Sequence, residues 1–543
     1  MFETAELGRK VAKRDFKRLV PPLREELLQL QEHLRRGRNF QVILLFSGVD
    51  GGGKGETVGL LNEWMDPRWL ITRAYDEPGD AERARPEFWR YWRDLPPAGR
   101  IGMFLSAWYH APLLDRVYGG SDEASFLRRL DRIIAFERAL ARNGALILKF
   151  WMHLSESAQE ARLKSLEHDP LTKARVTPHD WENWRNYAKF IAAAEPLIAR
   201  SNRGMAPWSI VEGADPYYRG LTVATILRDA LAERLSADAA PAKPRKNGKN
   251  SKNSKNGGDA KAAKAKARRP GPAEAITVLS GLDMTRTLGK AAYQKALPEL
   301  QAQLHLLHLR AKEQGVSSIL VFEGADAAGK GGAIRRIQEG LEPRNYQVHG
   351  IAAPTEEELA QHYLWRFWRD LSAAGHVTIF DRSWYGRVLV ERIEGFASED
   401  EWRRAYAEIN DFESQLIEHR IVLVKYWVHI TKKEQLARFK LREKTPHKRW
   451  KLTEEDWRNR NKWDLYEAAV NDMVQFTSTS SAPWHLIEGN DKRFARIKVL
   501  EILCKRLAAA LDKPEQRQKA MPVAAPARRP AKRPAAKART AAE

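Results

Sequence analysis

The chain contains one long unit written twice, and this duplication limits the folds that its 543 residues can adopt. The segment Gly48–Gly55 recurs in related form 276 positions later as Gly324–Gly331. The same ungapped offset relates five further pairs of segments: Trp89–Leu95 and Trp365–Leu371, Trp108–Tyr109 and Trp384–Tyr385, Lys149–His153 and Lys425–His429, Asp180–Trp181 and Asp456–Trp457, and Glu212–Gly213 and Glu488–Gly489. A repeat of about 230 residues is far longer than a solenoid unit, so we interpret it as a duplicated domain.

Each copy alternates apolar, strand-like runs with helical segments. In the second copy we expect a leading helix, with leucines at helical spacing, before a first strand at Ile319–Phe322. The other expected elements are helices over Leu359–Leu371, Trp402–Ile417 and Ile497–Leu507, and strands at Val377–Phe380, Ile421–Trp427 and Trp484–Ile487. This alternation predicts an α/β fold in each copy: a parallel sheet flanked on both faces by helices, with ligands at the carboxyl ends of the strands.

A glycine-rich loop follows the first strand and precedes a helix start at Ala333–Ile337. Its small residues let successive backbone N–H groups point at an anion, while Lys330 adds a mobile cation. The spacing fits G-x-x-x-x-G-K, except that a glycine replaces the Ser or Thr that usually follows the lysine. We therefore predict phosphate binding by this loop, through Gly324, Ala327, Ala328, Gly329, Lys330, Gly331 and Gly332.

Two carboxylates are candidates for holding a metal ion. Asp381 stands at the carboxyl end of the expected strand Val377–Phe380, and Asp326 lies inside the loop. Facing a phosphate, they can bind Mg²⁺ directly or through water, and Asp326 can take the place of the missing Ser or Thr. The alternative is that Asp381 only caps a helix. Its position beside Arg382 and Arg387 favours the metal role.

The stretch from Lys440 to Arg460 is dense in lysine and arginine, with tryptophans interleaved. Such a run is often only a solvated face. The alternative is a mobile lid whose arginines close over phosphates, which phosphoryl transfer requires because its catalysis is mainly positioning and charge neutralisation. We find no competing Ser-His-Asp, zinc-ligand or nucleophilic-cysteine pattern, and we expect the Trp-rich segments to be core.

Composition restricts the remaining classes. The net charge of +22 falls largely in 241–272 and 513–543, which together carry 17 of those charges and are poor in large apolar residues. Both segments have the composition of disordered chain, which either is simply solvated or recruits a polyanion. No run is long enough to span a membrane, no signal sequence is evident, and one cysteine, Cys504, predicts a buried structural thiol in a reducing compartment. We expect a soluble cytoplasmic protein.

Three motifs in order resemble the polyphosphate kinase 2 family: Gly-x-Asp-x-x-Gly-Lys-Gly at Gly324, Phe-Asp-Arg-Ser-Trp-Tyr at Phe380, and Arg-Trp-Lys-Leu at Arg449 with an acid following. The tandem layout resembles the two-domain members of that family, the polyphosphate:AMP phosphotransferases. The resemblance implies two tandem P-loop kinase-like domains with helical lids, and Mg²⁺ (or Mn²⁺) as cofactor. By resemblance, the active centre comprises Asp326, Lys330, Asp381 and Arg382, with Arg387 at the phosphates and Arg442 and Arg449 in the lid.

The resulting expectation is transfer of the terminal phosphoryl group of polyphosphate to AMP, giving ADP. The alternatives are a polyphosphate-dependent kinase of nucleoside diphosphates, an ATP-dependent P-loop nucleotide kinase, and a non-enzymatic binder of nucleic acid or polyphosphate. We expect polyphosphate and AMP or ADP as partners, no specific nucleic acid and no membrane. An oligomer is compatible with the sequence.

The first copy departs from the second where chemistry is expected. Leu105, Ser106, Ala111, Leu166 and Lys173 align with Asp381, Arg382, Arg387, Arg442 and Arg449, whereas the loop residues Asp50 and Lys54 are retained. We therefore expect residues 1–237 to form a degenerate, inactive domain that is structural or binds anions. A basic linker (238–274), a catalytic domain (275–512) and a basic tail (513–543) complete the predicted organisation.

Overall fold

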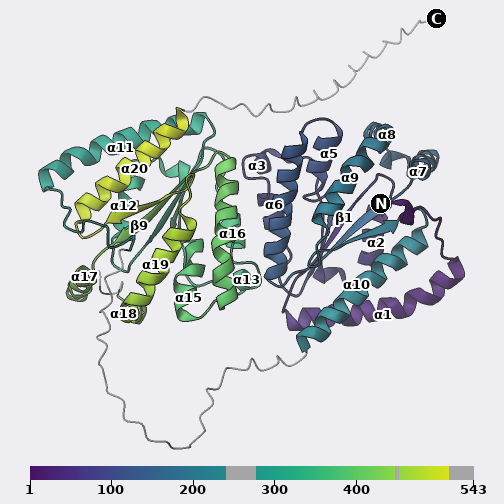
Figure 1. Ribbon diagram of the computed structural model, residues 1–543, viewed down its shortest axis with the longest axis horizontal. Coiled ribbons are helices and arrows are strands. Elements are labelled where there is room, and N and C mark those ends of the chain that lie inside the picture. The colour runs from purple at the N-terminus through teal and green to yellow at the C-terminus, as the bar shows by residue number, and fades with distance from the viewer. Residues whose placement is uncertain (171, 240–276, 447–448, 450–451, 513–543) are drawn as a thin grey trace, which may run out of the picture.

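The duplication in the sequence is a duplication of the fold. The computed structural model describes residues 1–170, 172–239, 277–446, 449 and 452–512, so most of the predicted linker and all of the predicted tail lie outside the described residues. The two copies form two lobes that lie side by side, each built around its own sheet (Figure 1). In the described part of the chain, no helix has the length and apolar character needed to cross a membrane.

Each sheet has five parallel strands, and the strands of the two copies have bounds that differ by the offset of the repeat. The strand orders are β2-β3-β1-β4-β5 and β7-β8-β6-β9-β10, read from the corresponding edge. The strands are β1 (Val42–Gly48), β2 (Leu70–Ala74), β3 (Ile101–Leu105), β4 (Leu146–His153), β5 (Trp208–Glu212), β6 (Ser318–Gly324), β7 (Tyr346–Gly350), β8 (Val377–Asp381), β9 (Val422–His429) and β10 (Trp484–Glu488). The predicted α/β fold is confirmed.

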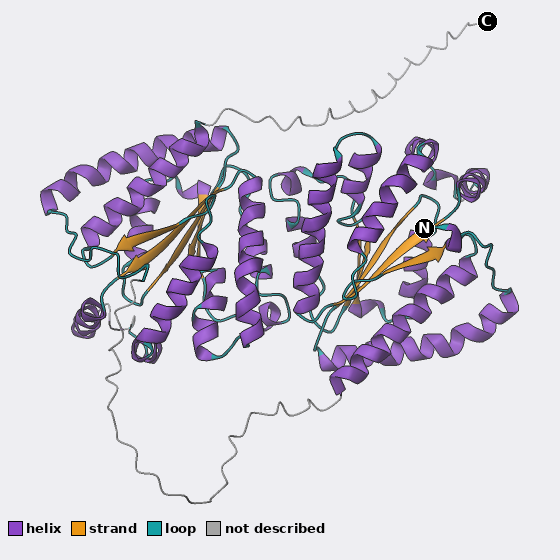
Figure 2. Ribbon diagram, viewed as in Figure 1, coloured by secondary structure: helices purple, strands orange, loops and turns teal. Residues whose placement is uncertain are grey.

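Helices cover both faces of each sheet (Figure 2). In the first copy they are α1 (Lys13–Gly37), α2 (Lys54–Trp64), α3 (Asp80–Arg83), α4 (Trp89–Asp94), α5 (His110–Val117), α6 (Glu123–Arg142), α7 (Glu156–His168), α8 (Pro178–Arg185), α9 (Tyr187–Ser201) and α10 (Pro216–Ala239). In the second they are α11 (Lys290–Glu313), α12 (Lys330–Gln338), α13 (Glu356–Leu359), α14 (Trp365–Arg369), α15 (Val390–Glu394), α16 (Glu399–Glu418), α17 (Lys432–Lys444), α18 (Glu454–Asn461), α19 (Trp463–Thr477) and α20 (Lys492–Leu511).

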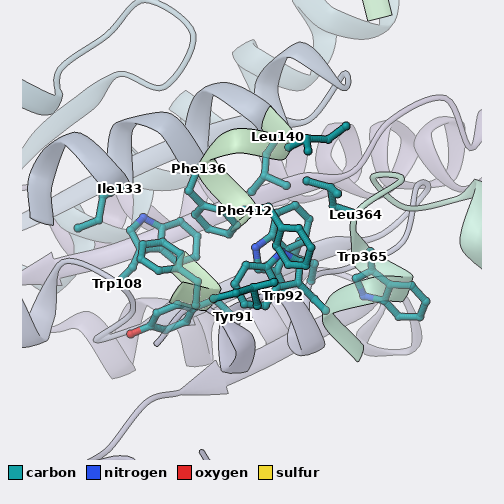
Figure 3. Close-up of a cluster of buried hydrophobic side chains, with 14 of the residues drawn as sticks. Tyr91, Trp92, Trp108, Ile133, Phe136, Leu140, Leu364, Trp365 and Phe412 are labelled. Carbon is teal, nitrogen blue, oxygen red and sulfur yellow. The ribbon is translucent and has the colours of Figure 1, made fainter. Parts of the chain in front are cut away.

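The inner faces of the two sheets share one continuous hydrophobic core. Buried aromatic side chains from α4 and α6 of the first copy meet those of α14 and α16 of the second (Figure 3). Separate clusters fill the outer faces, under α1, α2 and α10 in one copy and under α11, α12 and α20 in the other. The prediction that the tryptophans of these segments are core is confirmed by Trp108, Trp368 and Trp384, each about 1% exposed.

One sequence prediction about local structure was wrong, and one strand was not predicted. The expected helix Leu359–Leu371 is not continuous: α13 ends at Leu359 and α14 spans only Trp365–Arg369, and between them Gln361 and His362 are buried. The edge strand β7 was missed because its side chains are largely polar and half exposed.

The two copies differ in local structure directly after the third strand of the duplicated unit. The first copy has the regular helix α5 there, whereas the second has a 3₁₀ turn at Trp384–Val388 and a break at Leu389 before α15. This difference falls on the segment that carries the predicted catalytic motif.

Candidate active site

The glycine-rich loop of the second copy connects β6 to α12, as predicted. Gly324 and Gly329 have φ values of +148° and +113°, which L side chains rarely adopt. A Cβ on Gly324 would lie 2.4 Å from the Val428 carbonyl oxygen, so strand β9 also requires a glycine there. Lys330 begins α12 and donates from Nζ to the Gly324 carbonyl at 2.8 Å. The loop thus presents a helix N-terminus and a lysine to the same space.

Arg438 of α17 supports this loop from behind. Its Nη1 donates to the carbonyls of Ala327 and Ala328 at 2.9 and 2.8 Å, and its Nη2 donates to Gly489 O at 2.7 Å. Because C=O and N–H of a trans peptide point in opposite directions, this arrangement turns the Gly329 N–H away from Arg438. Sequence reasoning missed this arginine, which was only one of many basic residues before the predicted lid.

The predicted acid and arginine stand at the end of β8, beside the loop. Asp381 is the last residue of β8 and pairs with Phe322 of β6. Arg382 adopts a left-handed turn, with φ of +67°, and its N–H donates to Phe322 O at 3.0 Å. This turn directs the guanidinium over the loop, where Nη2 lies 2.7 Å from Asp326 Oδ1.

Charges within the cluster perturb one another. Burial lowers the pKa of Lys330, and the positive charge of Arg382 lowers it further, whereas Asp381 and Asp326 raise it. Burial also opposes the charge on Arg382, but attraction to Asp326 and Glu323 outweighs it and raises the pKa of Arg382. The structure therefore brings Asp326, Lys330, Asp381 and Arg382 into one electrostatically coupled group.

Glu323 is a further carboxylate of the site that sequence reasoning missed. It ends the apolar part of β6, is 5% exposed, and accepts a hydrogen bond from Ser383 Oγ at 2.8 Å. Burial raises the pKa of Glu323. In the first copy, Ser47 and Ala107 occupy the corresponding positions, so this pair is absent there, as are the acid and arginine predicted to be catalytic.

The lid reaches the site through a residue that was not predicted. Asn459 of α18 donates from Nδ2 to Asp326 Oδ2 at 2.9 Å, and Tyr466 donates to Asn459 Oδ1 at 3.1 Å. Arg442 lies on α17, where its charge acts on Asp456 of α18. Arg449 is exposed and donates to Glu443 O at 3.2 Å, within its own segment.

Arg387 lies beside the cavity rather than in it. Its guanidinium forms an ion pair with Glu391 at 3.2 Å and lies over the ring of Tyr363, 4.5 Å from the centroid. Among the described residues that line the cavity, Arg387 is not found. Its predicted contact with phosphate, like the lid roles of Arg442 and Arg449, stays a prediction.

A cavity of about 500 Å³ opens between the loop and the lid helices. Its polar part includes Glu323, Asp326, Arg382, Glu455, Arg458 and Asn459. Its apolar part is formed by Ile351, Ala352, Ala353, Pro354, Leu389 and Phe396. A site of this size, with apolar walls and a few converging polar groups, suits a nucleotide-sized ligand.

The donor set fits a divalent cation that is shared with a phosphate ligand. Asp326 and Asp381 supply the oxygen ligands that Mg²⁺ prefers. A Cβ on Gly331 would meet nothing within 4 Å, so the position of the usual Ser or Thr ligand is open space. Within the described residues, no group of three or more His, Cys, Asp or Glu side chains could enclose a metal by itself. The ion would complete its coordination with phosphate oxygens and water.

The corresponding space in the first copy is filled. Lys54 donates to Gly48 O at 2.7 Å and Val49 O at 3.0 Å, and a cavity of only about 10 Å³ remains beside it. His110 and Phe190 line that remnant, at positions where the second copy has Gly386 and Tyr466. The loop is retained, but the space that a substrate would need is closed by side chains.

Comparison with known proteins agrees with this geometry. The family model described as polyphosphate kinase 2 (PPK2) matches the chain twice, over residues 10–239 and 287–516. The chain belongs to the polyphosphate kinase 2 family. The resemblance inferred from its motifs is confirmed, and the matched ranges correspond to the two copies.

Relatives share the two-domain layout. The chain is 48% identical over 520 residues to a polyphosphate:AMP phosphotransferase of Pseudomonas aeruginosa, covering 94% of this chain and all of that protein. It is 40% identical over 474 residues to a polyphosphate:AMP phosphotransferase of Acinetobacter johnsonii, covering 87% and 92% of the two chains. A crystal structure described as a polyphosphate kinase 2 from Pseudomonas aeruginosa superimposes with a TM-score of 0.83, at 46% identity over 95% of this chain and all of that one.

Proposed function

We propose that the chain transfers the terminal phosphoryl group of inorganic polyphosphate to AMP, giving ADP. The observation that carries this proposal is the charged group of Asp326, Lys330, Asp381 and Arg382 in the second copy alone, of which Asp326 and Arg382 line the nucleotide-sized cavity. Relatives that match 94% and 87% of the chain and bear the name polyphosphate:AMP phosphotransferase support the choice of substrates.

The residues take the following roles in this reaction. Lys330 and the N-terminus of α12 hold the phosphates, and Asp326 and Asp381 hold Mg²⁺, which when bound neutralises charge on the transferring group. Arg382 is directed by its turn to the same place. The AMP phosphate oxygen attacks the terminal phosphorus, the bond to the rest of the polyphosphate breaks, and a chain shorter by one phosphate leaves. The second pKa of a phosphate monoester is about 6, so the attacking oxygen is largely deprotonated at neutral pH and needs no protein base.

The first copy serves no chemistry in this proposal, since Leu105 and Ser106 stand where Asp381 and Arg382 act. The basic residues of α17 and α18 favour a polyanionic donor over ATP. We place the reaction in the cytoplasm, because the single cysteine, Cys504, is free and buried, as in proteins of a reducing compartment.

Two variants and a donor swap test the proposal. Asp381→Asn should abolish polyphosphate-dependent ADP formation, whereas Lys54→Ala in the first copy should leave it intact. Chelation of divalent cations should also abolish it. The reverse pattern for the two variants would refute the assignment of the active copy. ATP supporting AMP phosphorylation while polyphosphate does not would show an ordinary nucleotide kinase, and phosphorylation of nucleoside diphosphates in place of AMP would identify the other alternative.

A further inference from the structure

Helix α14 of the second copy lies against the first copy. The rings of Trp368 and Trp92 stack with centroids 6.0 Å apart and an interplanar angle of 13°. These two tryptophans occupy equivalent positions in the duplicated unit, so the copies meet around an approximate twofold relation. Trp92 and the neighbouring Phe412 lie in the centre of the shared core (Figure 3).

The chain on both sides of α14 is also held by the first copy. Before the helix, Ala98 N donates to Ala360 O at 2.9 Å and Gln361 Nε2 donates to Leu95 O at 3.2 Å. After it, Arg85 Nε donates to Leu371 O at 3.0 Å. The five-residue helix is too short to be stable alone, so these contacts fix its position.

The opposite side of α14 supports the apolar wall of the cavity. Arg366 donates from Nη1 to Ala352 O at 3.2 Å and forms an ion pair with Glu358 at 3.2 Å, where both side chains are about 14% exposed. Glu358 in turn accepts from the Thr355 N–H at 3.0 Å. Arg366 and the segment Ile351–Pro354 line the cavity together. A continuous series of contacts therefore runs from the first copy, through α14, to this wall.

The chemistry of the wall indicates which substrate it faces. Ile351, Ala353 and Pro354, with Phe396 nearby, present apolar surface. Polyphosphate has no apolar surface to bury, whereas the adenine ring of AMP does. An apolar wall therefore suits the base of a nucleotide better than it suits polyphosphate.

We propose that the inactive first copy is a scaffold that sets the AMP-binding wall of the second copy through α14. Arg366 is then a positioning residue, and Trp92 and Arg85 contribute to AMP binding without touching the ligand. The proposal rests on the proposed function in naming AMP as the acceptor. The proposal explains why α4 of the first copy retains the surface that contacts α14, although the cavity of the first copy is closed.

The test uses the full-length protein. Arg85→Ala and Trp92→Ala should each raise the KM and the calorimetric Kd for AMP about tenfold, which corresponds to about 1.4 kcal/mol, and should change kcat and the KM for polyphosphate much less. The matched control is Arg132→Ala, which removes the ion pair between Arg132 of α6 and Glu418 of α16, another contact between the copies that does not involve α13 or α14. This control should leave AMP binding unchanged.

A double-mutant cycle identifies the route. Arg85→Ala and Arg366→Ala should be less than additive in their effect on AMP affinity, since both act through α14. Unchanged AMP affinity in folded Arg85→Ala, or strict additivity in the cycle, would overturn the proposal. Arg85→Ala decides the question even if Trp92→Ala does not fold, because it removes one hydrogen bond to the second copy and otherwise only contacts with Ala81 and Trp89 of its own copy. Calorimetry on the wild-type protein also separates this proposal from the proposed function. If the protein binds AMP but transfers no phosphoryl group to it, only the proposed function is contradicted. If the protein does not bind AMP, both proposals are overturned.

Discussion

The Arg382 guanidinium lies 2.7 Å from the Asp326 carboxylate, although 56 positions separate the two residues in the chain. The second oxygen of the same carboxylate accepts a hydrogen bond from Asn459 of the lid helix α18 at 2.9 Å. Asp326 therefore joins the phosphate-binding loop, the turn after β8 and the lid. A metal ion held by this carboxylate would compete with both partners for its oxygens, and would leave Arg382 available to the transferring phosphate.

Removal of the Arg382 guanidinium should reduce kcat strongly. Arg382→Ala eliminates a preorganised charge at the transferring group, for which losses of about 10²–10³ are typical. Ser106→Ala, at the equivalent turn of the first copy, is the matched control and should leave kcat unchanged. The measurement is polyphosphate-dependent ADP formation at saturating substrates. Near wild-type turnover in Arg382→Ala would remove this arginine from the mechanism.

Loss of Arg438 should impair both stability and phosphate binding. Arg438→Ala leaves the carbonyls of Ala327, Ala328 and Gly489 without their buried donor, and we expect a loss of about 2–4 kcal/mol in unfolding free energy. The remaining folded protein should show a raised KM for polyphosphate, because the loop is no longer fixed. Arg162→Ala is the control: this equivalent residue pairs with Glu56 near the surface, where ion pairs are worth under about 1 kcal/mol. Equal denaturant midpoints for both variants would contradict the assigned role.

Most of the fold could be predicted from sequence because the duplication presents the same pattern of strands and helices twice. Apolar strands such as Ile319–Phe322 carry their own signal, since they are buried on both faces. The edge strand β7 carries none, being short, polar and half exposed. The break between α13 and α14 contains Ala360 and Gln361, which contact the first copy, and such long-range contacts leave no local periodicity in the sequence.

The residues of the site likewise divide into those with a local sequence signal and those positioned only by long-range contacts. Asp326, Lys330, Asp381 and Arg382 were predictable because each belongs to a short motif whose spacing reflects loop geometry. Arg438 and Asn459 were not, because their partners are loop groups more than 100 positions away in the chain. Arginine and asparagine are also common on solvated helices, so these residue types in a charged region do not by themselves indicate a site.

A buried ion pair is repeated in both copies and should be required for folding of each. Lys425 Nζ lies 2.7 Å from Glu413 Oε2, and both side chains are at most 2% exposed. Tyr385 and Trp384 also donate to this carboxylate, at 2.6 and 3.1 Å. Glu413→Gln leaves a buried lysine without its counter-charge, so we expect a loss of about 3–5 kcal/mol.

The equivalent pair of the first copy provides the comparison for this prediction. Lys149 lies 2.7 Å from Glu137, and Glu137→Gln should destabilise its own domain to a similar extent. Urea unfolding followed by tryptophan fluorescence measures the loss of stability in both variants, since Trp108 donates a hydrogen bond to Glu137 and Trp384 donates one to Glu413. A Glu413→Gln midpoint equal to that of wild type would show that the pair contributes specificity of the fold rather than stability.

Acid should destabilise the first domain through His110, which fills its closed cavity. Burial, followed by the charge of Lys54, lowers the pKa of His110 to about 4. The ordinary value in an unfolded chain is about 6.5, so between these pH values the unfolded state binds the proton more strongly. The free energy of unfolding is therefore unaffected above the higher value and falls as the pH drops through this window. The shift corresponds to at most about 3 kcal/mol, and we expect about 1–2 because the ring is partly exposed.

His110→Phe removes this proton uptake while still filling the space. Urea midpoints measured on both sides of the window should therefore differ less in the variant than in wild type. His485→Phe is the parallel variant in the second copy, where burial and nearby Arg506 lower the pKa of His485 to about 4 as well. It should reduce the pH dependence of the urea midpoint of the second domain. The pH dependence of the first domain should remain as in wild type. An unchanged pH dependence in His110→Phe would mean that the ring is hydrated and titrates normally, and the first cavity would then be open to water rather than closed.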